Sequence, residues 1–475
     1  MSARIGVRNP RTGQIDCTIV PPDAGALDGL THRMREAQEA WNGNGLDARL
    51  EALRRWRDAL ARDRDAVIGA LTVDTGRHGV SVLELDLVLG ALDRWCRIAP
   101  SLLADQGEQD SGVPAIKLRG SQVPYALVGI VSPWNFPLLL ATLDTIPALV
   151  AGCAAIVKPS EIAPRFIRPL MKTVCAVDGL RDVLAFVEGA GETGAAIIDR
   201  VDMICFTGSV ATGRKVAQAA AARFIPSTLE LGGKDPAIVC DDADLELAAS
   251  AIVWGAVANT GQSCLSIERV YVDARVFDQF VDQVVARARG LKLAYPDLDD
   301  GPIGPIIAER QAGIIADHLA DARAKGAIVR CGGMVESLGG GWWCHPTVLT
   351  SVSHEMRVMT EETFGPIIPI MPFTGDDHAV ALANDTIYGL SAAVFSGREE
   401  RALAIAARLH AGAVSINDAA LTAVIHEGEK NAFRFSGMGE SRMGAASLRR
   451  FLRRKTFLIK KDATANPWWF KELTR

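Results

Sequence analysis

The sequence lacks any spacing of cysteine or histidine that would build a metal site or a disulfide framework. Its nine cysteines are an odd number and are scattered, with no C-x-x-C pair. Its eight histidines show no metal-ligand spacing, and no H-E-x-x-H occurs. We therefore expect no metal, reduced thiols and a cytoplasmic protein.

Long hydrophobic runs and a strong excess of one charge are also absent. The most apolar window, residues 138–157, contains Asp144 and Pro147, so we expect a buried helix and strand there and not a membrane span. Residues 1–18 have no apolar core, so we expect no signal peptide and no stable membrane anchor. The formal net charge of -5 argues against nucleic acid or an anionic membrane as a partner.

Alternating strand and helix patterns indicate the fold class. The 475-residue chain is long enough for two or three domains. Short β runs at 126–131, 154–158, 183–187 and 203–206 are separated by helical patterns, which predicts a doubly wound parallel sheet. A second α/β segment runs from about 233 to 454. Amphipathic helices are expected earlier, at 26–42, 47–75 and 80–98.

A β arm and an aromatic tail are expected outside these segments. Residues 113–119 and 121–127 look like two strands joined at Gly120, and residues 456–461 could complete a sheet with them. They form either an arm that reaches a partner subunit or a surface ribbon. The tail Pro467-Trp468-Trp469-Phe470 suggests contact with a neighbouring subunit; a lid or a foot on a membrane surface are the alternatives.

One thiol, Cys264, is placed as a nucleophile would be. It follows an apolar helix predicted over 244–258, with Asp241 and Asp242 at the expected cap. Gly261 lets the backbone turn sharply and lets a substrate approach closely. The turn then presents the thiol, although most cysteines are small buried hydrophobic residues.

Three other stretches accompany this thiol. They are Leu229-Glu230-Leu231-Gly232-Gly233-Lys234, Pro133-Trp134-Asn135-Phe136-Pro137 and Glu361-Glu362-Thr363-Phe364-Gly365-Pro366. In order and spacing the four motifs resemble the aldehyde dehydrogenase superfamily over nearly the whole chain. The resemblance implies an α/β fold with two doubly wound parallel-sheet domains and a small β oligomerisation arm, in a homodimer or homotetramer. It assigns residues 1–103 and 125–232 to NAD binding, 233–454 to the catalytic domain, and 104–124 and 455–475 to the arm and tail.

The dinucleotide site is predicted at the ends of strands. Gly191 lies in a G-x-G-x-x-G match over 189–194, but no acidic residue follows about 20 positions on. In the superfamily the phosphates are contacted by the next unit, so Gly208 and Ser209 are placed ahead of this match. By the same resemblance Glu362 would hold the nicotinamide ribose, while Phe364 and Trp134 would border the nicotinamide or simply pack.

Lys158-Pro159-Ser160-Glu161 closes an earlier strand. Lys158, Ser160 and Glu161 there suit the hydroxyls of a ribose. Because Glu161 should repel a 2′-phosphate, NAD is favoured, with NADP possible. A surface ion pair between Lys158 and Glu161 is the alternative.

The expected reaction is oxidation of a small-molecule aldehyde. Cys264 attacks the carbonyl carbon, and the Asn135 side chain with the Cys264 backbone N–H stabilises the oxyanion. Glu230 is the general base that hydrolyses the thioester, unless it only pairs with Lys234. A base at this position favours release of a free acid over transfer to coenzyme A or phosphate.

The substrate pocket is predicted to be mainly apolar. The region around residues 137–152 looks similar to branches related to diapocarotenoid-dialdehyde dehydrogenases, which favours a bulky apolar or aromatic aldehyde. Against this, His426, Lys430 and Arg434 could bind the carboxylate of a semialdehyde or a carboxylated aromatic aldehyde. A non-catalytic protein on the same scaffold is the alternative of another class. The expected pocket residues are Phe136, Leu139, Leu140, Leu143, Ser263, Leu265, Ala420, Leu421 and Arg434.

Overall fold

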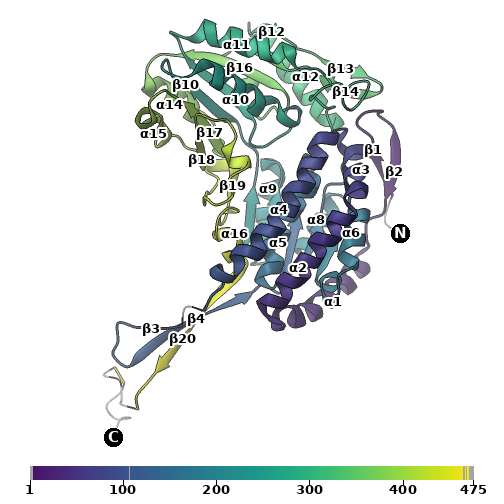
Figure 1. Cartoon of the computed structure of the whole chain (residues 1–475), viewed down its shortest axis with the longest axis vertical. Coiled ribbons are helices and arrows are strands. Elements are labelled where there is room, and N and C mark those ends of the chain that lie inside the picture. The colour runs from purple at the N-terminus through teal and green to yellow at the C-terminus, as the bar shows by residue number, and fades with distance from the viewer. Residues whose placement is uncertain (1–3, 106, 464–465, 467, 470–475) are drawn as a thin grey trace.

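Two mainly parallel β-sheets form the centres of two lobes, and a β arm extends away from them (Figure 1). The computed structural model describes residues 4–105, 107–463, 466, 468 and 469. The predicted fold class, α/β with two parallel-sheet units, is confirmed.

The first lobe contains a six-stranded sheet in the order β19-β9-β8-β5-β6-β7. All neighbours are parallel except β19 and β9. Its central strands are apolar except for Lys158 and Thr207 at their carboxyl ends, because helices cover both faces of the sheet. The strands are β5 (Leu127–Val131), β6 (Ala154–Lys158), β7 (Leu184–Phe186), β8 (Met203–Thr207), β9 (Ser227–Glu230) and β19 (Gly437–Met438).

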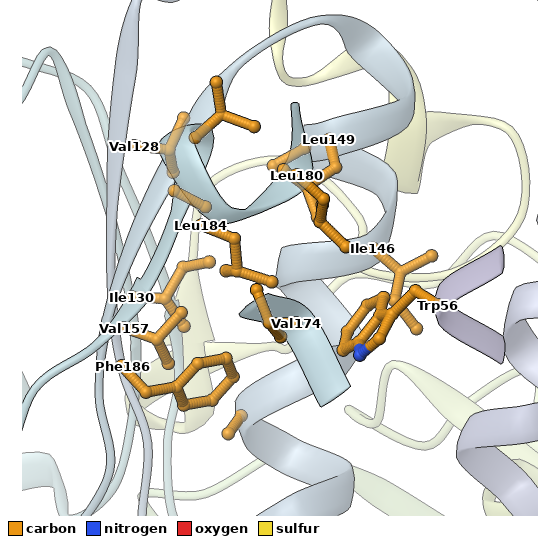
Figure 2. Close-up of a cluster of buried hydrophobic side chains, with 14 of the residues drawn as sticks. Trp56, Val128, Ile130, Ile146, Leu149, Val157, Val174, Leu180, Leu184 and Phe186 are labelled. Carbon is orange, nitrogen blue, oxygen red and sulfur yellow. The ribbon is translucent and has the colours of Figure 1, made fainter. Parts of the chain in front are cut away.

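Helices of the N-terminal region share one core with this sheet (Figure 2). Trp56 lies in that core beside Ile146 and Val174, and its Nε1–H donates to Thr173 Oγ1 at 3.0 Å. The opposite face packs on α8 (Gly191–Ile198) and α9 (Val210–Ala222). The predicted helix over 47–75 is two helices with a break at Asp63. The helices of the first face are α1 (Ala24–Gly43), α2 (Gly45–Arg62), α3 (Arg64–Thr75), α4 (His78–Leu102), α5 (Pro137–Ala151), α6 (Ile167–Cys175) and α7 (Leu180–Val183).

The second lobe contains a seven-stranded sheet in the order β12-β15-β16-β11-β10-β17-β18. Only the edge strand β12 is antiparallel to its neighbour. One face packs on α10 (Leu245–Val257) and α11 (Phe277–Gly290). The other packs on α12 (Glu309–Ala324), α14 (Asp376–Asn384) and α15 (Glu399–Ala406). The strands are β10 (Asp235–Val239), β11 (Ile267–Asp273), β12 (Ile328–Cys331), β15 (Thr347–Thr350), β16 (Ile367–Phe373), β17 (Ser391–Phe395) and β18 (Ala413–Ile416).

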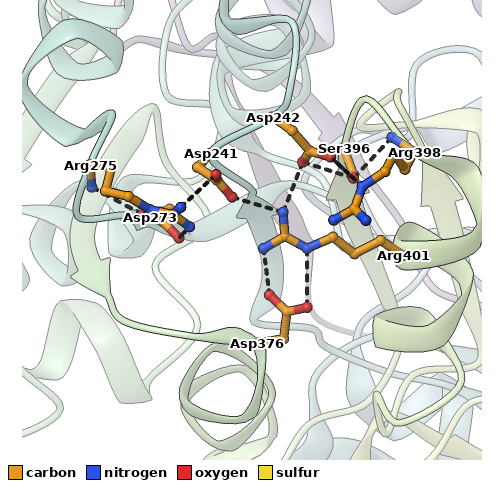
Figure 3. A network of polar contacts seen from close by, with 8 residues as sticks. All are labelled: Asp241, Asp242, Asp273, Arg275, Asp376, Ser396, Arg398 and Arg401. Atoms are coloured by element: carbon orange, nitrogen blue, oxygen red, sulfur yellow. Dashed lines mark hydrogen bonds and ion pairs between the residues drawn. The ribbon is translucent and has the colours of Figure 1, made fainter.

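The N-terminal cap of α10 differs from the prediction. Asp244 caps it, accepting from the amides of Glu246 and Leu247. Asp241 and Asp242 instead accept from the guanidinium of Arg401 on α15, in a network of aspartates and arginines (Figure 3). These two carboxylates therefore join β10 to a distant helix.

The arm is a three-stranded antiparallel sheet of β3 (Glu108–Asp110), β4 (Ile116–Pro124) and β20 (Leu452–Lys460). The predicted pairing of the C-terminal strand with this region is confirmed. The predicted turn at Gly120 is wrong, because β4 runs straight through Gly120, which pairs with Thr456. Trp468 and Trp469 of the tail are exposed, and Lys460 lies over the Trp469 ring; Pro467 and Phe470 lie outside the described residues.

The chain returns to the first lobe before it enters the arm. β19 pairs with β9, and α16 (Ala446–Arg449) packs on α5. Residues 437–451 thus lie with the first lobe, whereas the sequence placed them with the second. A buried carboxylate, Asp144, holds this return by accepting from Arg442 and Arg450.

Within the described residues, no helix is long and apolar enough to cross a membrane. All nine cysteines are free thiols. No group of three or more His, Cys, Asp or Glu side chains in this part of the chain is arranged to hold a metal ion.

Candidate active site

The predicted motifs meet at one edge of the six-stranded sheet. Lys158 ends β6, Thr207 ends β8 and Glu230 ends β9, while Asn135 follows β5. Because these strands are parallel, their carboxyl ends lie side by side, where ligands bind in open α/β sheets.

A strained backbone leads into residues 262–265, which carry the predicted nucleophile Cys264 and are called the nucleophile segment below. Asn259, Thr260 and Gly261 have φ values of 56°, 58° and 68°, which is the left-handed region. A Cβ on Gly261 would lie 2.2 Å from Gly365 O. The close approach that Gly261 permits is therefore to the 361–366 segment. Consecutive residues in this region mark a segment that its surroundings hold in place.

Cys264 lies half-buried in the turn that follows, as predicted. Burial, followed by the charges of Glu362, Glu230 and Asp235, raises the pKa of its thiol to about 12. Lys430 opposes them. The predicted nucleophile thus feels the charges of three carboxylates, with one ammonium acting against them.

Asn135 is buried and held against the nucleophile segment. Its Nδ2–H donates to Gln262 O at 3.0 Å, two residues before Cys264. Its backbone carbonyl accepts from Arg77 and from Asn259, each at 3.0 Å. The side-chain amide is therefore fixed beside the thiol-bearing loop.

Two glycines after Glu230 allow three segments to meet. A Cβ on Gly232 would lie 2.4 Å from Glu362 Oε2, and one on Gly233 would lie 2.5 Å from Cys264 O. The Gly233 N–H donates to Glu362 Oε1 at 3.1 Å. Burial, followed by the charge of Glu268, raises the pKa of Glu362 to about 8.

Glu230 is half-buried, and its charge acts on both Cys264 and Arg442. The alternative that Glu230 only pairs with Lys234 is wrong. The Lys234 ammonium lies 2.6 Å from Glu268 Oε2 instead.

The predicted cofactor residues lie along the same edge. Ser209 caps α9, and its exposed side chain accepts from Thr212 N; Gly208 N donates to Glu230 O at 3.1 Å. Lys158 Nζ lies 3.3 Å from Glu161 Oε2 and 3.4 Å from Ala190 O, next to Gly191, the first residue of α8. Ser160 Oγ accepts from Ile162 N. The rings of Trp134 and Phe364 meet edge to face at 5.5 Å.

The predicted substrate residues separate into two groups. Leu139, Leu140 and Leu143 of α5 are half-buried, as are Phe136 and the neighbours of the thiol, Ser263 and Leu265; Ala420 is buried and Leu421 exposed. Arg434 lies apart from them: its guanidinium donates to the carbonyls of Asn384 and Thr386 and contacts His410.

Sequence reasoning missed three buried charged residues around the site. Arg77 holds Asn135, and Glu84 Oε2 accepts from the amides of Leu138 and Leu139 at the start of α5. Glu268 binds Lys234 and the 361–364 segment. The signal for Glu268 was present, since Glu268 and Arg269 are two charged residues near the start of a β-rich run, four and five residues after Cys264.

Comparisons with known proteins cover most of the chain. The model of the aldehyde dehydrogenase family matches residues 1–457. The chain is 35% identical over 439 residues to a protein of Mycolicibacterium smegmatis named "Putative succinate-semialdehyde dehydrogenase (NADP+)", covering 92% of this chain and 84% of that one. It is 36% identical over 425 residues to the 4,4'-diapolycopene aldehyde oxidase of Methylomonas, covering 87% and 77%.

Two solved structures extend the likeness to three dimensions. The structure named "Putative Aldehyde Dehydrogenase PutA" of Anabaena variabilis is 60% identical, with a TM-score of 0.98, and covers 99% of this chain and 100% of that one. Betaine aldehyde dehydrogenase of Staphylococcus aureus, in complex with NAD+, is 29% identical with a TM-score of 0.92 and coverages of 98% and 94%.

These findings define an oxidoreductase that acts on aldehydes. The chain belongs to the aldehyde dehydrogenase family, as the motifs predicted. The prediction of a nicotinamide dinucleotide agrees with the relatives, one named for NADP+ and one in complex with NAD+. The alternative of a non-catalytic protein is set aside.

Proposed function

We propose that the protein oxidises an aldehyde with a bulky apolar or aromatic body to the free carboxylic acid, with NAD(P)+ as cofactor. The observation that carries this proposal is the meeting of the segments of Glu230, Cys264 and Glu362 at Gly232-Gly233, with Asn135 bound to Gln262 two residues before the thiol. The half-buried apolar side chains of α5, with Leu265, support an apolar substrate, as does the relative named for a diapolycopene aldehyde.

The residues present fit a dinucleotide. Ser209 is exposed at the N-terminus of α9, where free amides and the helix dipole favour a diphosphate. Lys158 and Glu161 offer a donor and an acceptor to a ribose, and Glu362 a second acceptor beside the nicotinamide end. Glu161 favours NAD over NADP. We assign this binding to the first lobe, residues 1–103, 125–232 and 437–451, and the nucleophile to the second lobe, residues 233–436.

Each step of the proposed oxidation is assigned to a side chain or backbone group of the site. The Cys264 sulfur, as thiolate, bonds to the aldehyde carbon, and the Asn135 amide with the Cys264 N–H stabilises the oxygen that becomes negative. When bound, NAD(P)+ would supply the acceptor for the hydride of this carbon, which would leave a thioester on Cys264. Glu230 takes a proton from water, which attacks the thioester and releases the acid and the thiolate.

A semialdehyde or a carboxylated aromatic aldehyde is the second candidate. Lys430 is the observation that favours it, because its charge reaches Cys264. The mycobacterial relatives are named for succinate semialdehyde. Arg434, the other predicted carboxylate binder, gives no support since backbone carbonyls and His410 occupy its guanidinium.

The test is NAD+ reduction by the purified protein without coenzyme A. Benzaldehydes and long apolar aldehydes are compared with succinate semialdehyde and carboxybenzaldehydes, with Cys264→Ala as control. Higher kcat/KM for uncharged aldehydes supports the first candidate. A preference for carboxylated substrates that falls in Lys430→Met supports the second. Activity only after addition of coenzyme A would contradict hydrolysis.

We also propose that the protein forms a homodimer or homotetramer through its arm. The arm extends beyond the two lobes (Figure 1), and it exposes Phe457 and Leu458. An exposed apolar strand of this kind favours contact with another copy of the chain.

A further inference from the structure

Glu268 is a buried carboxylate outside the set of groups that the reaction uses. It lies on β11, is 2% exposed, and accepts three hydrogen bonds. Its Oε2 accepts from Lys234 Nζ at 2.6 Å and from Thr363 N at 2.7 Å. Its Oε1 accepts from Phe364 N at 2.7 Å. Both oxygens are therefore committed to groups of this chain.

This carboxylate joins three parts of the active site. Glu268 follows Cys264 by four residues, and Lys234 follows Glu230 by four. The two amides that it binds belong to the residues directly after Glu362. The link is thus between the nucleophile segment, the strand end with the base, and the segment that carries Glu362 and Phe364.

Lys234 strengthens the link from the other side. Its ammonium, 1% exposed, also donates to Thr363 Oγ1 at 3.0 Å. The same hydroxyl lies 3.1 Å from His318 Nδ1 on α12. A buried ion pair persists only when hydrogen bonds satisfy both charges, and here they converge on Thr363.

Residues 362–364, which these bonds hold, include an unfavourable backbone conformation. Phe364 has a φ of 52°, which is unfavourable for an aromatic residue. Its ring meets Trp134 edge to face, and the preceding Glu362 accepts from Gly233 N. The bond from Phe364 N to Glu268 is charge-assisted, and such bonds are the stronger ones.

We propose that Glu268, with Lys234 as its counter-ion, is the positioning residue that fixes Glu362 and Phe364 against the nucleophile segment and so sets the affinity for the nicotinamide dinucleotide. This inference rests on the proposed function, in which Glu362 and Phe364 border the nicotinamide ribose. Both side chains of the pair are buried, with Glu268 2% and Lys234 1% exposed, so the proposed effect passes through the residues that they bind.

The first test is Glu268→Gln in the full-length protein. We expect Kd and KM for NAD+ to rise roughly tenfold or more, because one amide oxygen replaces a carboxylate that serves three donors. KM for the aldehyde and the rate of Cys264 alkylation by iodoacetamide, with Cys264→Ala as the blank, should stay within about twofold. An unchanged Kd for NAD+ would overturn the proposal.

Glu355→Gln is the matched control. Glu355 lies seven residues before Glu362, and its exposed side chain is outside the hydrogen bonds that join Glu268, Lys234 and Thr363. NAD+ affinity should stay at the wild-type value in this variant. An equal loss in both variants would show a general effect of the segment and would contradict a specific role of Glu268.

A double variant separates positioning from stability. Lys234→Met with Glu268→Gln removes both buried charges, so it should recover thermal stability that Glu268→Gln alone loses. If Glu268→Gln alone does not fold, NAD+ binding by the double variant is compared with that of the wild-type protein. Weak NAD+ binding in the stable double variant supports positioning; wild-type binding refutes it. Calorimetric titration of NAD+ needs no turnover, so absence of dehydrogenase activity would count against the proposed function alone.

Discussion

At the scale of single residues, Glu230 is expected to act after the hydride has left. Its charge reaches Cys264, while Lys234 is engaged by Glu268 and leaves Glu230 unneutralised by that lysine. Glu230→Gln should keep a first turnover close to one NADH per site and slow steady-state release by roughly 100-fold or more, the usual contribution of a general base. Stopped-flow absorbance of NADH measures both phases. An equal fall in both would contradict the deacylation role.

The ammonium of Lys430 is expected to favour the Cys264 thiolate. Lys430 lowers the pKa of a thiol that burial, Glu362, Glu230 and Asp235 raise to about 12. In Lys430→Met the pKa of the thiol should therefore rise, and alkylation by iodoacetamide should need a higher pH. Lys430→Arg should keep the wild-type profile. A profile that does not move in the methionine variant would show that the charge does not reach the thiol.

Glu362 should make the stability of the cofactor-free protein depend on pH. Burial raises the pKa of its carboxyl from 4.5 to about 8, so the folded chain keeps a proton that the unfolded chain releases. The stabilisation from this group is full below about 4.5 and is lost as pH rises through 8. The wild-type protein should lose unfolding free energy between pH 5 and pH 9, and Glu362→Gln should reduce this loss by on the order of 1–3 kcal/mol. Thermal unfolding at each pH measures the difference as a smaller fall of Tm in the variant. Identical slopes in both proteins would contradict the shift.

At the scale of elements, Arg401 joins two helices to a strand end. Its guanidinium on α15 binds Asp376 at the start of α14, and Asp241 and Asp242 after β10 (Figure 3). Arg401→Met should lower the free energy of unfolding by about 1–2 kcal/mol. The loss is limited to this size because the ions are only partly buried. Arg408 pairs with Asp377, whose side chain is exposed, so Arg408→Met should leave the free energy of unfolding almost unchanged. Urea unfolding measures both, and equal costs would contradict the network.

The elements also show how far sequence reasoning reaches. The alternation of strands and helices, and the position of Asn135 and Glu230 at strand ends, followed from local patterns. The path of β4 through Gly120 did not, because its partner β20 is more than 300 residues away. The cap of α10 was misplaced for a similar reason, since a distant arginine holds Asp241 and Asp242. For Lys234 the nearby Glu230 was considered, but the true partner Glu268 comes from another strand.

At the scale of the whole molecule, the arm should decide the oligomeric state. Leu458 is 74% exposed and lies on β20, which is at one edge of the three-stranded sheet. Leu458→Asp should shift the protein towards the monomer, because a charge at an apolar contact opposes association. Light scattering after size exclusion measures the mass, with the exposed loop variant Glu440→Gln as control. A wild-type protein that is monomeric would contradict the proposal.

Residues 437–451 lie with the first lobe, and this has a consequence for the design of fragments and fusions of this protein. The chain leaves the first lobe at Leu231 and comes back at Ser436, and the N–H of Leu231 donates to Ser436 O at 2.8 Å. The second lobe is therefore a module inserted between two points that touch. A fragment ending at residue 232 would lack β19 and expose the edge of β9, inviting aggregation. A fusion that keeps residues 1–232 and 436–463 and replaces the module between them retains that strand pairing, so grafting is expected to succeed where truncation fails.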